Sequence, residues 1–188
     1  MWASPVRAQD KPPFAPTRDV TINYRVTAPG QPATEVRILS RPGGTPMRVD
    51  MLTEGTSILF DRKAGVMTMV VPEERMAMDL QLSAGQQDFV LNDRMRFARR
   101  GTDTVAGLRC TVWDVTQGAE RSTACISAEG VILRLLGREA GGGRNTMEAT
   151  SVEFEMQPDS AFVPPPEFLR EQAVPVGPSQ SAPPRRPR

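Results

Sequence analysis

Turn-forming residues divide this chain into short segments, and this division restricts its fold more than any other feature. The sequence holds 18 prolines and 15 glycines, and pairs such as Pro29-Gly30 and Gly43-Gly44 separate segments rich in apolar and β-branched residues. Proline and glycine favour turns over helix interiors. Segments that repeat every 8 to 12 residues or so are typical of antiparallel all-β proteins. We therefore expect a mainly β fold without βαβ units, because short connections join antiparallel neighbours.

Alternation of apolar and polar residues is clearest in the first and last predicted strands. Every second residue from 20 to 26 is apolar, and so is every second residue from 152 to 156. Such alternation indicates strands with one buried face. The predicted strands cover residues 19–28, 34–41, 46–53, 56–62, 65–71, 75–82, 94–100, 108–116, 121–127, 130–138 and 146–157.

Few helices are predicted, and both are short. Residues 83–93 are predicted to form one or two turns capped by Ser83, and residues 166–172 another with Pro166 in its first turn. Neither segment is long enough to cover the face of such a sheet. The sheet is therefore expected to curl around its own apolar side, or to leave part of that side open.

The composition excludes several classes of function. The chain has no histidine, and its 23 Lys and Arg against 22 Asp and Glu give a formal net charge of +1. Without histidine it lacks the common Ser-His and Cys-His nucleophile pairs and every imidazole metal site. Balanced charge provides no strong field for nucleic acid. We expect no enzymatic activity, no cofactor, no metal centre, no nucleic-acid partner and no membrane span, since no apolar run is long enough.

Both ends of the chain differ in composition from the middle. Residues 1–18 combine Val-Arg-Ala at 6–8, which resembles a signal-peptidase site without its apolar region, with a proline-rich leader. An ordinary flexible N-terminus is the alternative. Residues 171–188 are rich in proline and arginine, which is typical of a disordered tail. Between them, residues 19–170 are predicted to form a single β domain.

The two cysteines, Cys110 and Cys125, lie in a predicted hairpin. A two-residue turn at Gln117-Gly118 would place them directly opposite each other, within disulfide reach. A disulfide is stable where thiols oxidise, so this pair favours a periplasmic or secreted protein. Two buried free thiols are the alternative.

Methionines concentrate in two neighbouring predicted strands. Each strand carries two methionines that share a face, namely Met67, Met69, Met76 and Met78. If both pairs lie on one side of the sheet, they form an apolar patch that Met47 and Met51 would extend. Methionine surfaces adapt to acyl chains or apolar peptides. The alternatives are plain core packing and a Cu(I) site, since thioethers select that ion.

Arginines are densest shortly before the cysteine hairpin, between residues 94 and 100. Alternation puts Arg94 and Arg96 on one face of a strand, with Met95 and Phe97 pointing inward. This pattern predicts either a solvated strand face or a rim that receives a phosphate or carboxylate headgroup.

Several short motifs resemble a family of uncharacterised bacterial periplasmic proteins. In Thr104-Val105-Ala106-Gly107-Leu108-Arg109-Cys110 the sequence is similar to that family's "tVaG-x-x-C" motif. Residues 75–76 are Arg-Met, where the family usually has lysine and an aromatic residue. The other segments that carry the resemblance are residues 58–76, 124–134 and 162–168.

The resemblance implies the fold of the outer-membrane lipoprotein carrier (LolA-like) superfamily. That fold is a strongly curved antiparallel sheet, an incomplete barrel, whose apolar concave face is partly covered by one or two short helices or by a loop. Members of known role carry lipidated proteins or lipids across the periplasm, and the resemblance implies a similar ligand here.

These observations predict a non-enzymatic periplasmic or secreted protein that binds a lipid, an acyl chain or a lipoprotein anchor in a curved sheet. The alternatives are a cell-envelope protein-interaction or sensor module with a filled core, and a methionine-based Cu(I) carrier. The predicted ligand-binding residues are Met47, Met51, Met67, Met69, Met76, Met78, Phe97 and Phe154.

Overall fold

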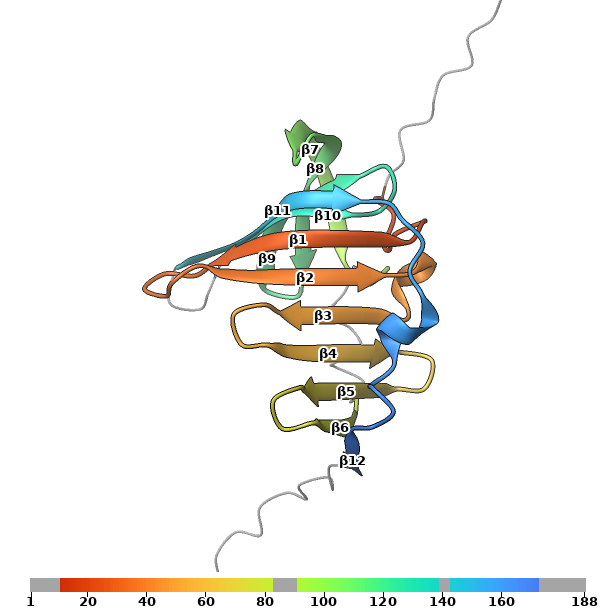
Figure 1. Cartoon of the computed structure of the whole chain (residues 1–188). Helices are drawn as coiled ribbons and strands as arrows, with labels where there is room; N and C mark the ends of the chain where they lie inside the picture. The colour runs from red at the N-terminus through yellow and green to blue at the C-terminus, as the bar shows by residue number, and fades with distance from the viewer. Residues whose placement is uncertain (1–10, 83–90, 139–142, 173–188) are drawn as a thin grey trace, which may run out of the picture.

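The structure, a computed structural model, describes residues 11–82, 91–138 and 143–172. Twelve strands form one sheet in the order β12-β6-β5-β4-β3-β2-β1-β11-β10-β9-β8-β7 (Figure 1). The strands are β1 (Val20–Thr27), β2 (Thr34–Ser40), β3 (Met47–Met51), β4 (Thr56–Asp61), β5 (Val66–Val71), β6 (Met76–Gln81), β7 (Arg96–Val105), β8 (Leu108–Gln117), β9 (Glu120–Ser127), β10 (Ile132–Arg138), β11 (Arg144–Glu153) and β12 (Leu169–Gln172).

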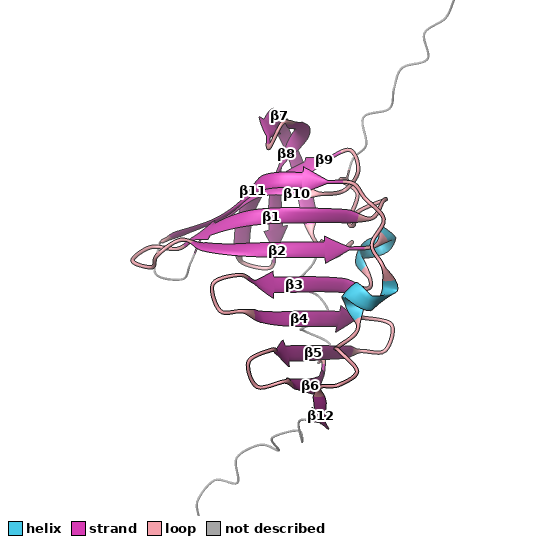
Figure 2. Ribbon diagram, in the orientation of Figure 1, coloured by secondary structure: helices cyan, strands magenta, loops and turns pink. Residues whose placement is uncertain are grey.

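The predicted mainly β fold with a curved, open sheet is confirmed. Helical structure in the described residues is confined to two 3₁₀ turns, η1 (Pro42–Gly44) and η2 (Asp159–Phe162) (Figure 2). Strands β1 to β6 and β7 to β11 form two antiparallel meanders, joined where β1 pairs with β11. The sheet does not close, because β7 and β12 at its two ends are not neighbours.

The helix predicted at residues 166–172 is wrong, because β12 forms there and pairs in parallel with β6. After a single turn, in which the Phe168 amide donates to the Pro165 carbonyl oxygen at 3.1 Å, the backbone of residues 169–172 bonds to β6 instead of continuing as a helix. The extended chain then reaches the edge of β6, where the Leu169 amide donates to the Arg75 carbonyl oxygen at 2.9 Å. Residues 83–90 of the other predicted helix lie outside the described residues, as do residues 173–188 of the predicted tail.

The main core lies where the sheet curls on itself. It contains buried residues of β1, β2, β7, β8, β9, β10 and β11, among them Val20, Tyr24 and Leu133. Arg134 on β10 pairs with Asp103 on β7 at 2.6 Å and with Glu148 on β11 at 2.5 Å. Since two strands separate β7 from β10 in the sheet, these contacts show that the β7–β8 hairpin bends back over β10 and β11.

Residues 11–18, which the sequence assigns to a leader, pack against the sheet. The Thr17 amide donates to the Glu129 carbonyl oxygen at 2.9 Å, and the Gly43 amide donates to the Pro16 carbonyl oxygen at 2.8 Å. The ring of Phe14 stacks on Phe97 with centroids 5.7 Å apart. This N-terminal segment therefore links the β9–β10 turn, η1 and β7.

Candidate functional site

One side of β3 to β6 carries all six predicted methionines. Directly paired residues share a face of a sheet, and the register pairs Met47 with Phe60, Phe60 with Met67, and Met69 with Met78. We call this side the methionine face; it consists of Met47, Val49, Met51, Thr56, Ile58, Phe60, Met67, Met69, Val71, Met76, Met78 and Leu80.

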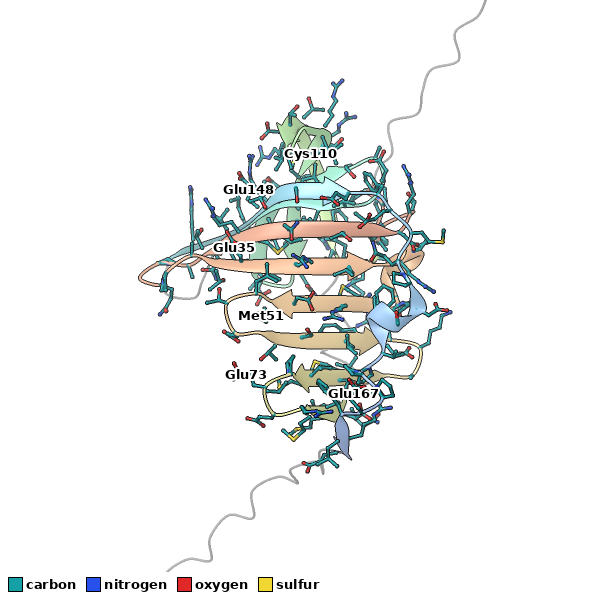
Figure 3. All side chains as sticks on the ribbon, in the orientation of Figure 1. Glu35, Met51, Glu73, Cys110, Glu148 and Glu167 are labelled. Atoms are coloured by element: carbon teal, nitrogen blue, oxygen red, sulfur yellow. A yellow bond between two sulfur atoms is a disulfide. The ribbon has the colours of Figure 1, made fainter. Side chains whose placement is uncertain are left out.

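The methionine face is apolar but only partly covered. Its twelve residues are all half-buried, and its one polar side chain is that of Thr56. Val49 and Met51 pack against the main core, so the face continues inward from the concave side of the sheet. Met51 marks its edge at the end of β3 in Figure 3.

The opposite side of the same strands is more fully buried. Leu59, Val70 and Ala77 form a small core there, with exposed fractions of 5%, 5% and 0%, and Phe168 packs on it. Residues 154–168, which we call the strap, cross this side of the sheet; Glu167 in Figure 3 belongs to the strap.

Two arginines hold the strap against the sheet. Arg41 donates from Nη2 to the Gln157 carbonyl oxygen at 2.8 Å and pairs with Asp159 at 2.6 Å. Arg48 donates to the Ala161 carbonyl oxygen at 3.2 Å and pairs with Asp50 at 2.6 Å. The strap therefore covers the convex side of β3 to β6, which faces solvent in a sheet with only one buried face.

Phe97 and Phe154, the two remaining predicted ligand residues, do not belong to the methionine face, although Phe154 packs on the same main core as Met51. Phe97 belongs to a second core cluster and meets Trp113 edge-on at 6.3 Å between ring centroids. Phe154 follows the end of β11, where the Arg18 guanidinium lies 4.9 Å from its ring centroid. Met156, predicted to share an apolar strand face with Phe154, is 88% exposed, because β11 ends at Glu153.

The predicted headgroup rim is divided by the start of β7. Arg94 precedes the strand, and its amide donates to Asn92 Oδ1 at 3.0 Å. Arg96 is the first residue of β7 and pairs with Thr116 of β8. Met95 and Phe97 lie in the second core cluster, as alternation predicts. The register also places Arg121 opposite Thr116, in the same row as Arg96, and sequence spacing carries no signal for Arg121.

The disulfide between Cys110 and Cys125 is present, with Cα atoms 5.4 Å apart. The predicted hairpin register is wrong by two residues, because Gln117 pairs with Glu120 and Cys110 therefore lies opposite Ser127. A shift of two residues keeps each side chain on its original face. The cysteines are thus diagonal neighbours on one face, still within disulfide reach.

Among residues 11–82, 91–138 and 143–172, no group of His, Cys, Asp or Glu side chains could hold a metal ion. No helix in the same described part of the chain has the length and apolar character needed to cross a membrane.

A family model described as "Domain of unknown function (DUF4412)" matches residues 31–134, more than half of the chain. The matched region runs from the β1–β2 turn into β10, so it includes the methionine face and the disulfide. No curated protein matches the sequence.

Solved structures with TM-scores above 0.5 share the fold. An uncharacterized conserved protein from Thermus thermophilus has a TM-score of 0.58 and 11% identity, over 84% of this chain and 91% of that chain. A chain of the Pseudomonas aeruginosa MucA/MucB complex has a TM-score of 0.55 and 13% identity, over 81% of this chain and 57% of that chain. A LolA superfamily protein from Nitrosomonas europaea has a TM-score of 0.43 and 13% identity, over 82% and 93%.

Proposed function

Because the chain belongs to the DUF4412 family, whose function is unknown, we propose a function from its own geometry. The protein binds an elongated apolar group, such as the acyl chain of a lipid or of a lipidated protein, on the methionine face. The observation that carries this proposal is the difference between the two sides of β3 to β6. The strap buries one side, whereas the more apolar side is left half-buried.

The energetics favour a ligand on this face. Burying a methionine side chain completely contributes about 1.5 to 3 kcal/mol, and each of the six half-buried methionines retains at most about a third of that free energy, so a ligand gains by contacting several of them together. Methionine side chains are unbranched and polarizable, so they can repack around chains of different shape. The cross-strand pair of Met69 and Met78 lies within the face, with Met67 and Met76 on the same two strands.

The disulfide supports placing this activity outside the cytoplasm. Disulfides persist in secreted and periplasmic proteins and are rare where glutathione keeps thiols reduced. The protein is therefore proposed to act in the cell envelope, as a binding protein rather than an enzyme.

A protein partner on the same face is the second candidate. A structure that shares this fold with a TM-score of 0.55 was solved as the complex of MucA and MucB. Methionine-rich surfaces also bind peptides, because they adapt to apolar side chains.

The direct test exports the protein to a bacterial periplasm, measures its native mass, and identifies any molecule released on denaturation. A stoichiometric lipid or acyl species supports the proposal. Purified protein stripped of ligand is then titrated with fatty acids of increasing length. Each methylene buried adds about 0.8 kcal/mol, so affinity should rise about fourfold per methylene until the face is filled.

Substitutions locate the site. Met69→Gln with Met78→Gln should weaken fatty-acid binding about thirtyfold, because each change removes about 1 kcal/mol of apolar contact. Met156→Gln is the matched control, since Met156 is 88% exposed, and it should bind as the parent does. Equal affinities for all three proteins would contradict the proposed site. Met69→Leu with Met78→Leu distinguishes apolar binding from the Cu(I) alternative, because leucine keeps the apolar surface and removes the thioethers. This variant should keep its affinity for fatty acids, whereas a Cu(I) site would lose its affinity for the metal.

A further inference from the structure

A second concave region lies on the far end of β8 to β11, away from the methionine face. It is a hollow of about 420 Å³. We call it the arginine hollow; its lining residues are Asp114, Val115, Thr116, Arg121, Ser122, Thr123, Leu136, Gly137 and Arg144. Hydroxyl and guanidinium groups are prominent among these side chains, so its chemistry differs from that of the methionine face.

The strand register explains how the hollow is built. Asp114, Thr123 and Leu136 are paired in one row across β8, β9 and β10 and form its floor. The next row pairs Thr116 with Arg121, and Arg96 of β7 lies opposite Thr116 on the same face. Arg144, at the start of β11, is on the other side of the hollow. Two arginines, from β9 and β11, therefore line the hollow around a floor that contains a hydroxyl group, and Arg96 of β7 lies beside the lining residue Thr116.

The charges of the hollow are unbalanced. Its one carboxylate, Asp114, accepts hydrogen bonds from Arg100 Nε at 2.6 Å and Nη2 at 2.5 Å, and this pairing raises the pKa of Arg100 above its usual range. Within the described part of the chain, Arg96, Arg121 and Arg144 make no ion pair. The hollow thus holds excess positive charge, although the whole chain has a net charge of only +1.

We propose that the arginine hollow binds a phosphate group. Guanidinium groups donate paired, charge-assisted hydrogen bonds to phosphate oxygens, and Thr116, Ser122 and Thr123 place hydroxyl groups at the same hollow. A tetrahedral anion can accept from donors on several sides, which suits a hollow lined by arginines of β9 and β11 with a third arginine beside it on β7. The proposal is independent of ligand binding on the methionine face, because the two regions share no residue.

The test titrates the full chain with inorganic phosphate, followed by isothermal calorimetry. Saturable binding is expected. The double variant Arg121→Gln with Arg144→Gln should bind phosphate more weakly. Each arginine should account for a loss of at least about tenfold in affinity, because its charge-assisted hydrogen bond is removed. The charge-matched control is Arg25→Gln with Arg109→Gln, two exposed strand arginines outside the hollow, and it should bind phosphate as the parent does.

Thr123→Val distinguishes a shaped site from a diffuse positive surface. Valine keeps the size of threonine and changes no charge, so a diffuse field would not respond to it. A phosphate seated on the floor of the hollow should bind about three to ten times more weakly. Thermal unfolding of each variant verifies that it is folded.

Vesicles identify the source of the phosphate. The parent protein is mixed with phosphatidylglycerol vesicles and, separately, with phosphatidylcholine vesicles. If it sediments only with phosphatidylglycerol and inorganic phosphate releases it, the bound phosphate belongs to a lipid headgroup. Calorimetric binding without sedimentation assigns a soluble phosphate or phosphate ester. The proposal is overturned if inorganic phosphate shows no saturable binding, or if the hollow and control variants lose affinity equally.

Discussion

Removing the disulfide should cost this protein a defined part of its stability. Cys110 and Cys125 are 15 residues apart in sequence, and closing a loop of that length restricts the unfolded chain by about 3 kcal/mol. The cysteines are only 2% and 3% exposed, so replacing them also removes packed sulfur atoms from the core. Cys110→Ala with Cys125→Ala should therefore lower the free energy of unfolding by about 3 kcal/mol or slightly more.

The assay is urea unfolding of the parent and the double variant, each with and without a reducing agent. With a denaturant dependence of about 1 to 3 kcal/mol per molar urea, the parent's midpoint should fall by about 1 to 3 M on reduction. The double variant serves as the control, because its midpoint should not respond to reductant. An unchanged midpoint for the reduced parent would refute the reasoning, and so would denatured, unreduced parent that reacts with two equivalents of a thiol reagent.

Three further predictions concern the core and the N-terminal segment. Gly130→Ala should lower the free energy of unfolding by about 2 kcal/mol and expose the N-terminal segment to protease. Gly130 has a φ of 81°, and an added Cβ would lie 2.1 Å from the Ala15 carbonyl oxygen. An unchanged pattern of protease digestion would count against this contact. Leu133→Ala should lower the free energy of unfolding by about 3 to 5 kcal/mol, since Leu133 is 0% exposed, and a loss below about 1 kcal/mol would contradict its place in the core. Tyr24, the only tyrosine, should stay protonated in the folded protein well above its usual range, because burial raises its pKa. Its contribution to stability is then complete below pH 10 or so and falls at higher pH, where the unfolded chain ionises first; phenolate absorbance that appears near pH 10 in folded protein would disprove this.

The strands were predictable because their signal is local. Alternation along β1 depends on neighbouring residues alone, and the predicted segment 19–28 contains the whole of Val20–Thr27. The common face of the six methionines was predicted only conditionally, since it depends on how one strand pairs with the next. Cross-strand pairs such as Met69 and Met78 supply that missing information.

Features that depend on distant segments could not be predicted in the same way. β12 is four residues long and pairs with a strand far earlier in the sequence, so no periodicity marks it. The proline-rich residues 11–18 resemble a disordered leader in composition, but their carbonyl and amide groups find partners at Glu129 and Gly43. The arginine hollow combines residues of β8, β9, β10 and β11. Their alignment depends on the register of the β8–β9 hairpin, and turn chemistry alone predicts that register with an error of two residues.

The pairing of β12 with β6 has a consequence for the protein as it is synthesised. β5 and β6 can form their hairpin early, whereas Leu169, which pairs with Met76, is translated long afterwards. Until then, the backbone of β6 has no neighbour on one edge, beside an apolar surface rich in methionine. Open edges of this kind template wrong pairing with other chains. Met76–Gln81 is therefore a part of the sheet where an unfinished chain is exposed to aggregation.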